Sequence, residues 1–232
     1  LIDECSMLSK GHQEDLIERI GGRVIFMGDP DCQLQFIMTA EDEEALTKRF
    51  GCKNLIPAEY YQPFDKECSL IQNIVTLTKN YRIKCDILRK VTKRMRYFIK
   101  SGKRNSAPLY TLFPEIKTIT RDELKNVYNH KEDIILVRSH KLNNMYNEMF
   151  SDKEKYKILE QKKGLYNGSI VFEKPEGIRN EFRHGYTIHS VQGETYEGNI
   201  FIDVQGMSHY SRMLYTAVSR GQYAEKIYFV IP

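Results

Sequence analysis

Residues 133–137 read Asp-Ile-Ile-Leu-Val, an acid followed by four apolar side chains. Similar apolar runs occupy residues 170–172, 199–204 and 226–231, and stretches with a helical pattern, such as residues 143–150, lie between them. A strand that is apolar on both faces belongs in the middle of a sheet covered by helices on both sides. The runs therefore predict an α/β fold built on a parallel sheet.

The first part of the chain shows the same alternation on a smaller scale. Residues 23–27 (Arg-Val-Ile-Phe-Met) and 74–77 (Ile-Val-Thr-Leu) are further apolar runs and predict two more strands. We place the boundary between two α/β lobes near Thr76. This boundary divides the chain into residues 1–76 and residues 77–232.

Composition excludes several classes of protein. Of 232 residues, 41% are hydrophobic and 28% are charged, with 35 Lys and Arg against 31 Asp and Glu, which is typical of a folded globular protein. No apolar run approaches the length of about 18 residues that a membrane-spanning helix needs, so we expect no membrane partner. The five cysteines form no Cys-x-x-Cys pair, which argues against a zinc site or a disulfide framework and favours an intracellular compartment.

Two adjacent acids follow the apolar start of the chain, in the order Ile2-Asp3-Glu4. A strand that ends in acids places them at the carboxyl edge of a parallel sheet, where ligands bind in such folds. One carboxylate can hold Mg²⁺ and the other can orient or deprotonate an attacking water. Asp-Glu pairs are also common on solvated surfaces, so this pair alone leaves both interpretations open.

A second polar segment, residues 28–33 (Gly-Asp-Pro-Asp-Cys-Gln), follows the predicted strand at residues 23–27. We expect this segment to lie beside the first strand tip. Gln33 has a donor and an acceptor, and can therefore touch a terminal phosphate and an attacking water together. The alternative is an ordinary turn shaped by Asp29 and Pro30.

Arginines follow later in the chain. Arg82 lies at the predicted boundary between the lobes, and its permanently charged guanidinium could stabilise charge on a phosphoryl group. The alternative is a surface arginine at the start of a basic helix. Residues 186–195 and 215–220 add two polar segments, each immediately before a predicted strand, and the second ends in Arg220.

Taken in order, these segments resemble the motifs of superfamily 1 helicases, especially the RecD-like branch and the C-terminal region of UvrD-like enzymes. Residues 2–7 resemble motif II, residues 28–34 motif III, residues 77–82 motif IV, residues 187–193 motif V, residues 215–220 motif VI, and Asn167-Gly168 the turn that precedes motif V. The resemblance covers the whole chain. It implies two RecA-like parallel-sheet lobes, the first incomplete at its N-terminus.

The resemblance also implies roles for individual residues, with ATP and Mg²⁺ as cofactors. Asp3 would bind the Mg²⁺ ion, Glu4 would activate water and Gln33 would sense the γ-phosphate. Arg82 and Arg220 would act as paired arginine fingers.

Five more residues take binding roles by the same resemblance. Asp29, Gln192 and Gly193 would line the nucleotide, and Thr187 and His189 would lie near the nucleic-acid backbone. The partner would be DNA, as a single strand or a fork, and translocation along it would follow from opening and closing of the lobes. An RNA helicase of the same superfamily is the competing enzyme.

One element of the family is absent from the sequence. No Gly-x-x-x-x-Gly-Lys-[Ser/Thr] phosphate loop occurs, and Gln35-Phe36 stands where prolines usually follow Gln-Leu in motif III. We expect the chain to be the downstream part of a longer protein and to lack detectable ATP hydrolysis by itself. A non-catalytic nucleic-acid-binding fragment is the alternative from a different functional class.

One further segment of the chain is strongly basic. Residues 79–104 contain eleven Lys and Arg and one acid, within which we predict a helix over residues 84–99 closed by Ser101-Gly102. These cations could bind phosphates, or they could form a solvated face whose opposite side packs on the sheet. The predicted packing side consists of Ile87, Val91, Met95 and Phe98.

Overall fold

The computed structural model describes residues 1–77, 80–103, 106–161, 166, 168–209 and 211–232. Thr78 and Lys79 of the motif IV segment, Arg104 of the basic segment and Asn167 of the predicted turn lie outside the described residues. The chain divides into two compact units, Leu1–Asn80 and Tyr81–Pro232.

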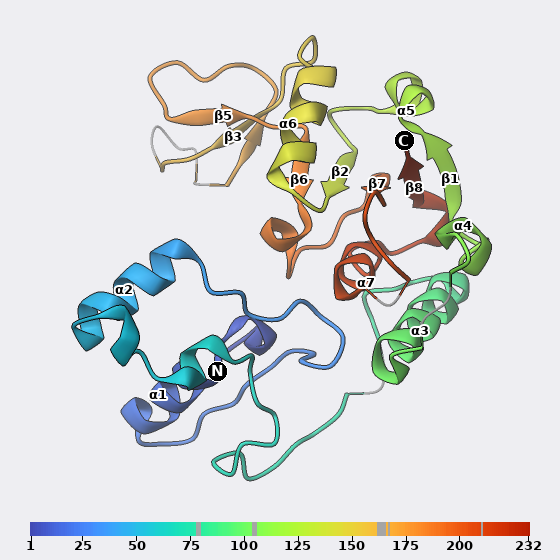
Figure 1. Cartoon of the computed structure of the whole chain (residues 1–232). Helices are drawn as coiled ribbons and strands as arrows, with labels where there is room; N and C mark the ends of the chain where they lie inside the picture. Colours follow the sequence, from blue (N-terminus) through green and yellow to red (C-terminus); the bar gives the residue numbers. More distant parts are fainter. Residues whose placement is uncertain (78–79, 104–105, 162–165, 167, 210) are drawn as a thin grey trace. The chain divides into compact units, whose positions relative to one another are not determined.

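The described elements are the following (Figure 1). The α-helices are α1 (Lys10–Ile20), α2 (Ala40–Phe50), α3 (Asp86–Ser101), α4 (Leu109–Leu112), α5 (Arg121–Val127), α6 (His140–Met149) and α7 (Arg212–Val218). The strands are β1 (Lys117–Thr120), β2 (Ile134–Val137), β3 (Tyr156–Ile158), β4 (Ile170–Val171), β5 (Asn180–Phe182), β6 (Gly185–Thr187), β7 (Ile200–Asp203) and β8 (Ile227–Ile231). Short 3₁₀ helices are η1 (Cys5–Met7), η2 (Lys53–Leu55), η3 (Ala58–Tyr61), η4 (Ile188–Val191) and η5 (Ala224–Lys226).

A five-stranded parallel sheet forms the centre of the second unit. Its order is β1-β8-β7-β2-β6, and every pair of neighbouring strands is parallel. The predicted α/β fold with a parallel sheet is confirmed, and three of its strands, β2, β7 and β8, lie where the apolar runs predict them. The two outer strands, β1 and β6, were not predicted, because their short sequences Lys-Thr-Ile-Thr and Gly-Tyr-Thr contain few apolar residues.

Both faces of this sheet are buried. On one face Ile135, Val137, Phe201 and Val230 pack against α5 and α6. Alternate residues of the same strands point to the other face, and Leu136, Ile202 and Phe229 are buried there as well. In Figure 1, α6 runs alongside β2 and β6, and α3 lies against α7. This burial on both sides explains why the central strands are continuously apolar.

Helix α3 is strongly amphipathic. It ends at Ser101 with Gly102 in the left-handed conformation (φ 61°), as the Ser101-Gly102 pair predicts. Its packing side differs from the prediction at one position, since Ile87 is exposed and Leu88 is buried in its place. The helix begins at Asp86, and this start places residues 88, 91, 92 and 95 on one face at intervals of three and four.

A separate three-stranded antiparallel sheet has the order β4-β3-β5. The apolar run at residues 170–172 enters this small sheet as β4, so its assignment to the parallel sheet was wrong. Ile170 and Val171 are only half-buried there. Three apolar residues in a row can satisfy either kind of sheet, and the local pattern does not distinguish them.

The first unit contains helices joined by loops. Leu46 of α2, Ile56 and Tyr60 form its small described core. The two strands predicted here, at residues 23–27 and 74–77, are not formed in the described part of the chain, where Ile2 and Phe26 make one isolated parallel bridge. Val75 and Leu77 are 82% and 89% exposed. An apolar run becomes a strand only where a neighbouring strand accepts its hydrogen bonds, and these segments have at most one bridging residue.

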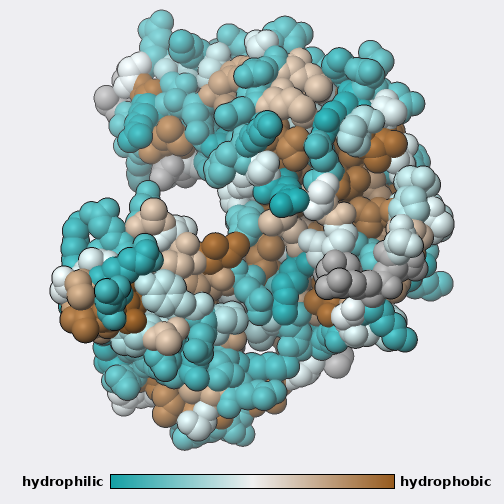
Figure 2. All heavy atoms as spheres, in the orientation of Figure 1, coloured by the Kyte–Doolittle hydropathy of each residue, from teal (hydrophilic) through white to brown (hydrophobic). Residues whose placement is uncertain are grey.

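The surface is mixed in character. The face drawn in Figure 2 is largely hydrophilic, with hydrophobic residues in separate groups. Within the described residues, no helix has both the length and the hydropathy needed to cross a membrane.

Candidate functional site

The two predicted strand tips of the first unit lie side by side. The Ile2 amide donates to the Ile25 carbonyl at 2.8 Å, and the Met27 amide donates to the Ile2 carbonyl at 2.7 Å. One turn further on, the Cys5 amide donates to the Met27 carbonyl at 2.8 Å. The acids that follow Ile2 and the Gly28-Asp29 turn that follows Met27 therefore emerge together, as the sequence predicts.

Glu4 has an unusual backbone conformation. Its φ of 52° and ψ of 42° are left-handed, and no other non-glycine residue in the described part of the chain has a positive φ. This conformation costs a non-glycine residue about 1–2 kcal/mol. It is held by the Glu4 amide, which donates to Asp3 Oδ1 at 2.8 Å, and by the Glu4 carbonyl, which accepts from Met7 at 2.9 Å. Local strain of this kind concentrates at functional residues.

Gly28 allows the two tips to approach closely. A Cβ atom at this position would stand 2.9 Å from Cys5 Sγ and 3.0 Å from the Cys5 nitrogen, closer than real Cβ contacts permit. Cys5 itself is buried. Burial, followed by the charges of Glu4, Asp3 and Asp29, raises the pKa of the Cys5 thiol to about 11. The thiol therefore stays protonated at neutral pH.

Gln33 is part of the turn that begins at Asp29. The Asp29 amide donates to Gln33 Oε1 at 3.2 Å, and the Gln33 amide donates to the Asp29 carbonyl at 2.9 Å. The Phe36 amide then donates to the Ser6 carbonyl at 2.9 Å, which ties the residues after Gln33 to η1. The structure thus brings Asp3, Glu4, Asp29 and Gln33 together within the first unit.

The oxygen atoms at these tips suit Mg²⁺ only in combination with other ligands. Within the described residues, no group of three or more His, Cys, Asp or Glu side chains is arranged to hold a metal by itself. Mg²⁺ in nucleotide sites is usually bound by one or two carboxylates, phosphate oxygens and water. The exposed Asp3 carboxylate fits this mode, with the phosphates and water supplying the remaining ligands.

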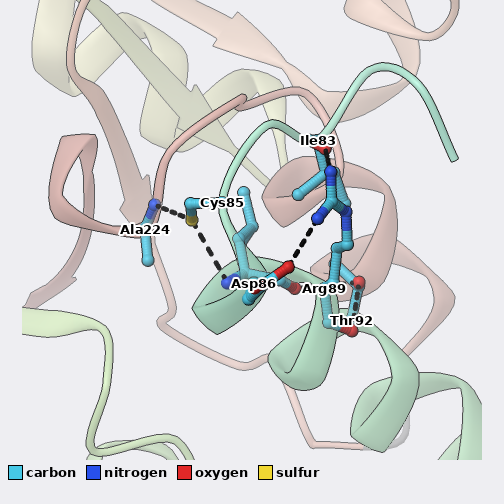
Figure 3. Close-up of polar contacts among 7 residues, drawn as sticks. Ile83, Cys85, Asp86, Arg89, Thr92 and Ala224 are labelled. Carbon is cyan, nitrogen blue, oxygen red and sulfur yellow. Dashed lines mark hydrogen bonds and ion pairs between the residues drawn. The ribbon is translucent and has the colours of Figure 1, made fainter.

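In the second unit, the segment that follows Arg82 is anchored to the segment that follows Arg220. The Lys84 amide donates to the Gln222 carbonyl at 3.0 Å. Cys85 Sγ accepts from the Ala224 amide at 3.3 Å and from the Leu88 amide at 3.4 Å (Figure 3).

Arg89 completes this anchor from helix α3. Its guanidinium donates to the Ile83 carbonyl at 2.9 Å and to Asp86 Oδ1 at 2.5 Å (Figure 3). Ile83 is buried, while Arg82 beside it is half-exposed. Five hydrogen bonds therefore hold the residues that follow Arg82, and they fix the position of the backbone from which its side chain extends.

Arg220 is fully buried. Its guanidinium donates to the Thr216 carbonyl at 3.0 Å, to the Glu194 carbonyl at 3.1 Å and to Ser219 Oγ at 3.2 Å. Its own carbonyl accepts from the Tyr196 amide at 3.1 Å. Arg220 thus connects the end of α7 to Glu194 and Tyr196. These two residues follow Gln192 and Gly193 closely, so the structure brings the predicted nucleotide-binding residues of the second unit together.

Thr187 and His189 lie at the end of β6 and in η4. Thr187 is 8% exposed, and its carbonyl accepts from Ser190 Oγ at 2.8 Å. Burial lowers the pKa of the His189 imidazole. His189 Nε2 is buried without a hydrogen-bond partner in the described part of the chain. An unsatisfied buried nitrogen is costly, so a ligand or water contact at this ring would stabilise it.

The carboxyl edge of the parallel sheet holds further polar groups that the sequence analysis did not single out. Thr187 pairs with Val137, so Arg138 at the end of β2 comes to the same edge. Asp203, at the end of β7, is fully buried, and Arg121 donates to its Oδ2 at 2.8 Å while the Tyr146 hydroxyl donates to the same oxygen at 2.6 Å. Asp203 follows an apolar run, as Asp3 does, and this sequence pattern could have indicated it. Its partners Tyr146 and Arg121 could not have been identified in this way, because they lie in helices 57 and 82 residues away in sequence.

Comparison with solved structures shows that this architecture also occurs in Pif1 helicases. A Pif1 helicase studied at forked double-stranded DNA matches with a TM-score of 0.62 and 18% identity over 98% of this chain and 68% of that one. The Bacteroides Pif1 helicase in complex with ADP-AlF3 and single-stranded DNA matches with a TM-score of 0.60 and 18% identity over 98% of this chain and 69% of that one. The chain has the fold of the Pif1 helicases.

A third solved structure shows the same likeness. The Pif1 helicase from Candida albicans matches with a TM-score of 0.57 and 13% identity, over 99% of this chain and 71% of that one. Pif1 helicases belong to superfamily 1, so the fold predicted from the motif order is confirmed. No protein-family model and no curated protein sequence matches this chain.

Proposed function

We propose that this chain is the C-terminal part of an ATP-dependent superfamily 1 helicase that couples ATP hydrolysis to movement along DNA. The observation that carries the proposal is the parallel bridge between Ile2 and Phe26, which brings Asp3, Glu4 and Asp29 to one edge beside the Gln33 turn. The chain also has the fold of Pif1 helicases. Both features agree with the motif order in the sequence.

The first unit would supply the hydrolytic groups. Glu4, held in its left-handed backbone conformation, would orient the attacking water and accept its proton. Gln33, fixed by the Asp29 turn, would contact that water and the terminal phosphate. Asp3 would hold Mg²⁺, which when bound neutralises charge on the phosphates. Asp29 would line the nucleotide-binding site.

The second unit would supply the positive charge. Arg82 would stabilise charge that develops on the transferred phosphoryl group, because a guanidinium presents several donors and is always ionised. Arg220 would do the same once its guanidinium leaves the Thr216, Glu194 and Ser219 oxygens that it contacts in this structure. The bonds that tie residues 84 and 85 to residues 222 and 224 support a common role for these arginines, since they fix the two segments together. Gln192 and Gly193 would line the nucleotide beside Arg220.

Thr187 and His189 would contact the backbone of the nucleic acid at the carboxyl edge of the sheet. The Pif1 structures in complex with single-stranded DNA and at forked DNA support DNA as the partner. Binding and hydrolysis would alternately close and open the two lobes and so step the protein along one strand. RNA is the competing substrate, and unwinding of matched RNA and DNA duplexes distinguishes the two.

A non-catalytic nucleic-acid-binding role is the second candidate. The observation that favours it is the sequence itself, which contains no phosphate loop. In that case the 232-residue chain would bind nucleic acid without hydrolysing ATP.

The deciding experiment compares two proteins in an ATPase assay with single-stranded DNA. The 232-residue chain is expected to show no turnover. The full-length protein that contains it is expected to hydrolyse ATP, and Glu4→Gln in that protein is expected to abolish turnover while nucleotide binding persists. Turnover by the 232-residue chain, or full activity of the Glu4→Gln protein, would refute this assignment.

A further inference from the structure

The cations of helix α3 fall into two groups. The arginines are used within the second unit: Arg89 pairs with Asp86, Arg94 donates to both oxygens of Glu115 at 2.6 and 2.7 Å, and Arg96 donates to the Tyr215 hydroxyl at 3.1 Å. These contacts hold the helix on its neighbours. None of these contacts involves Lys90 or Lys93 of the same helix.

The lysines lie on the opposite side from the core. Leu88, Val91 and Met95 are fully buried, whereas Lys90 and Lys93 are exposed and have no acidic partner within the described part of the chain. The sequence positions 90, 93, 97 and 100 follow one another at intervals of three and four, so these residues form one stripe along the helix. The stripe is about 15 Å long at about 1.5 Å per residue.

An aromatic residue lies within this stripe. The Tyr97 side chain is 53% exposed, and Lys103 Nζ stands 5.6 Å from the centroid of its ring. We call Lys90, Lys93, Tyr97, Lys100 and Lys103 the α3 lysine patch.

The composition of the α3 lysine patch indicates that it binds a polyanion. Like charges three or four residues apart destabilise a helix by a few tenths of a kcal/mol per pair, and Asp86 is the single acid of α3. A solvated helix face often alternates charges of the two signs, which this face does not. Lysines around an exposed ring are instead the combination that binds single-stranded nucleic acid, because ammonium groups bind phosphates and unpaired bases stack on the ring.

We propose that the α3 lysine patch binds single-stranded nucleic acid, with the lysines on its phosphates and Tyr97 stacked on an unpaired base. This inference rests on the proposed function and adds a contact surface on an element separate from Thr187 and His189. A duplex would engage the lysines but offers no unpaired base to Tyr97.

The first test measures binding of the 232-residue chain to a labelled oligo-dT strand and to a duplex of equal length, by fluorescence anisotropy over a salt series. The slope of log K against log salt is expected to fall by about 0.7 for each lysine removed, and therefore by about 2 in K90Q/K93Q/K100Q. Tyr97→Ala is expected to weaken single-strand binding by about tenfold and to leave duplex binding unchanged.

Matched controls come from other exposed positions of the second unit. Lys125→Gln on α5 removes one charge, and Tyr166→Ala removes a ring that is 64% exposed. Neither is expected to change the slope or the affinity beyond the effect of net charge. An unchanged slope in K90Q/K93Q/K100Q, or equal losses in the controls, would overturn the proposal. Equal loss of duplex binding in Tyr97→Ala would also overturn it.

A second readout locates the strand directly. Ultraviolet crosslinking with an oligonucleotide that contains 5-bromodeoxyuridine is expected to label the tryptic peptide of residues 97–100, which mass spectrometry identifies. If the wild-type chain binds DNA and this peptide stays unlabelled, the α3 lysine patch is wrong and the proposed helicase function still stands. That function is tested independently by ATP hydrolysis in the full-length protein.

Discussion

The sulfur of Cys85 accepts a hydrogen bond from the backbone amide of Ala224, 3.3 Å away and 139 residues later in the sequence. The same sulfur caps α3 by accepting from the Leu88 amide. One side chain therefore begins the long basic helix and also ties the segment of Arg82 to the segment of Arg220. A substitution at Cys85 should therefore affect both the start of α3 and the link between these two segments.

Cys85→Ala is expected to lower the free energy of unfolding of the second unit by about 1 kcal/mol, because it leaves two amides without their acceptor. Cys85→Ser, which keeps an acceptor at this position, is expected to lie closer to wild type. Urea unfolding followed by circular dichroism measures both. Equal losses in the two variants would indicate that sulfur packing, and not hydrogen bonding, is what matters.

Gly28→Ala is expected to destabilise the first unit by about 1–3 kcal/mol, because its Cβ would collide with Cys5 Sγ and the Cys5 backbone. Gly22→Ala is the matched control, since its Cβ would meet only the Ile20 carbonyl at 3.7 Å. Thermal unfolding of the two variants makes the comparison. Similar melting temperatures would show that the two strand tips can separate at little cost.

Arg82→Ala in the full-length protein is expected to reduce the rate of ATP hydrolysis by about 10³-fold or more, with a much smaller effect on nucleotide affinity. Arg82 is the more informative of the two arginines, because it is half-exposed, whereas Arg220→Ala would also remove three buried hydrogen bonds. Single-turnover kinetics and nucleotide titration separate the two effects. Equal losses of rate and affinity would argue against a finger role.

The pH dependence of stability should report on His184. This ring is fully buried, its Nε2–H donates to the Lys153 carbonyl at 2.7 Å, and its Nδ1 accepts from the Tyr128 hydroxyl at 3.1 Å. Burial, and then the charges of Lys155, His130 and Lys153, lower the pKa of His184 from 6.5 to about 4. The folded state therefore keeps the ring neutral while the unfolded state takes up a proton.

Stability contributed by neutral His184 is thus present above pH 6.5 and is lost as the pH falls towards 4. The shift corresponds to about 3 kcal/mol. His184→Gln is expected to remove this part of the acid destabilisation, whatever its stability at neutral pH. Urea unfolding at pH 7, 5.5 and 4 measures the slope, and parallel profiles for the two proteins would contradict the assignment.

Sequence patterns predicted the strands that are buried on both faces. β2, β7 and β8 are apolar along their length because they are buried on both faces, and that burial is visible in the sequence. β1 is half-exposed and reads Lys-Thr-Ile-Thr, so it gives no such signal. Residues 23–27 are an apolar run that was predicted to be a strand. Apart from one bridge, no neighbouring strand pairs with them, and the strand is not formed.

The candidate site divides in the same way. Asp3, Glu4 and Gln33 were predicted as site residues because their segments follow apolar runs, and a ligand edge is where such runs end. The left-handed backbone of Glu4 and the contact of Arg121 and Tyr146 with Asp203 could not be found. The first is a local backbone conformation that a non-glycine residue type does not signal, and the second depends on residues brought together from distant parts of the chain.

By itself, the sequence determined local features of this protein: the buried strands β2, β7 and β8, the residue at which α3 ends, and the polar residues that follow the apolar runs. Tertiary structure alone decided the strand order, in which β8, the last strand, lies between β1 and β7. It also decided the pairing of residues 84 and 85 with residues 222 and 224. Local patterns follow from whether each side chain is buried or exposed, whereas these pairings follow from hydrogen bonds and packing between segments that are far apart along the chain.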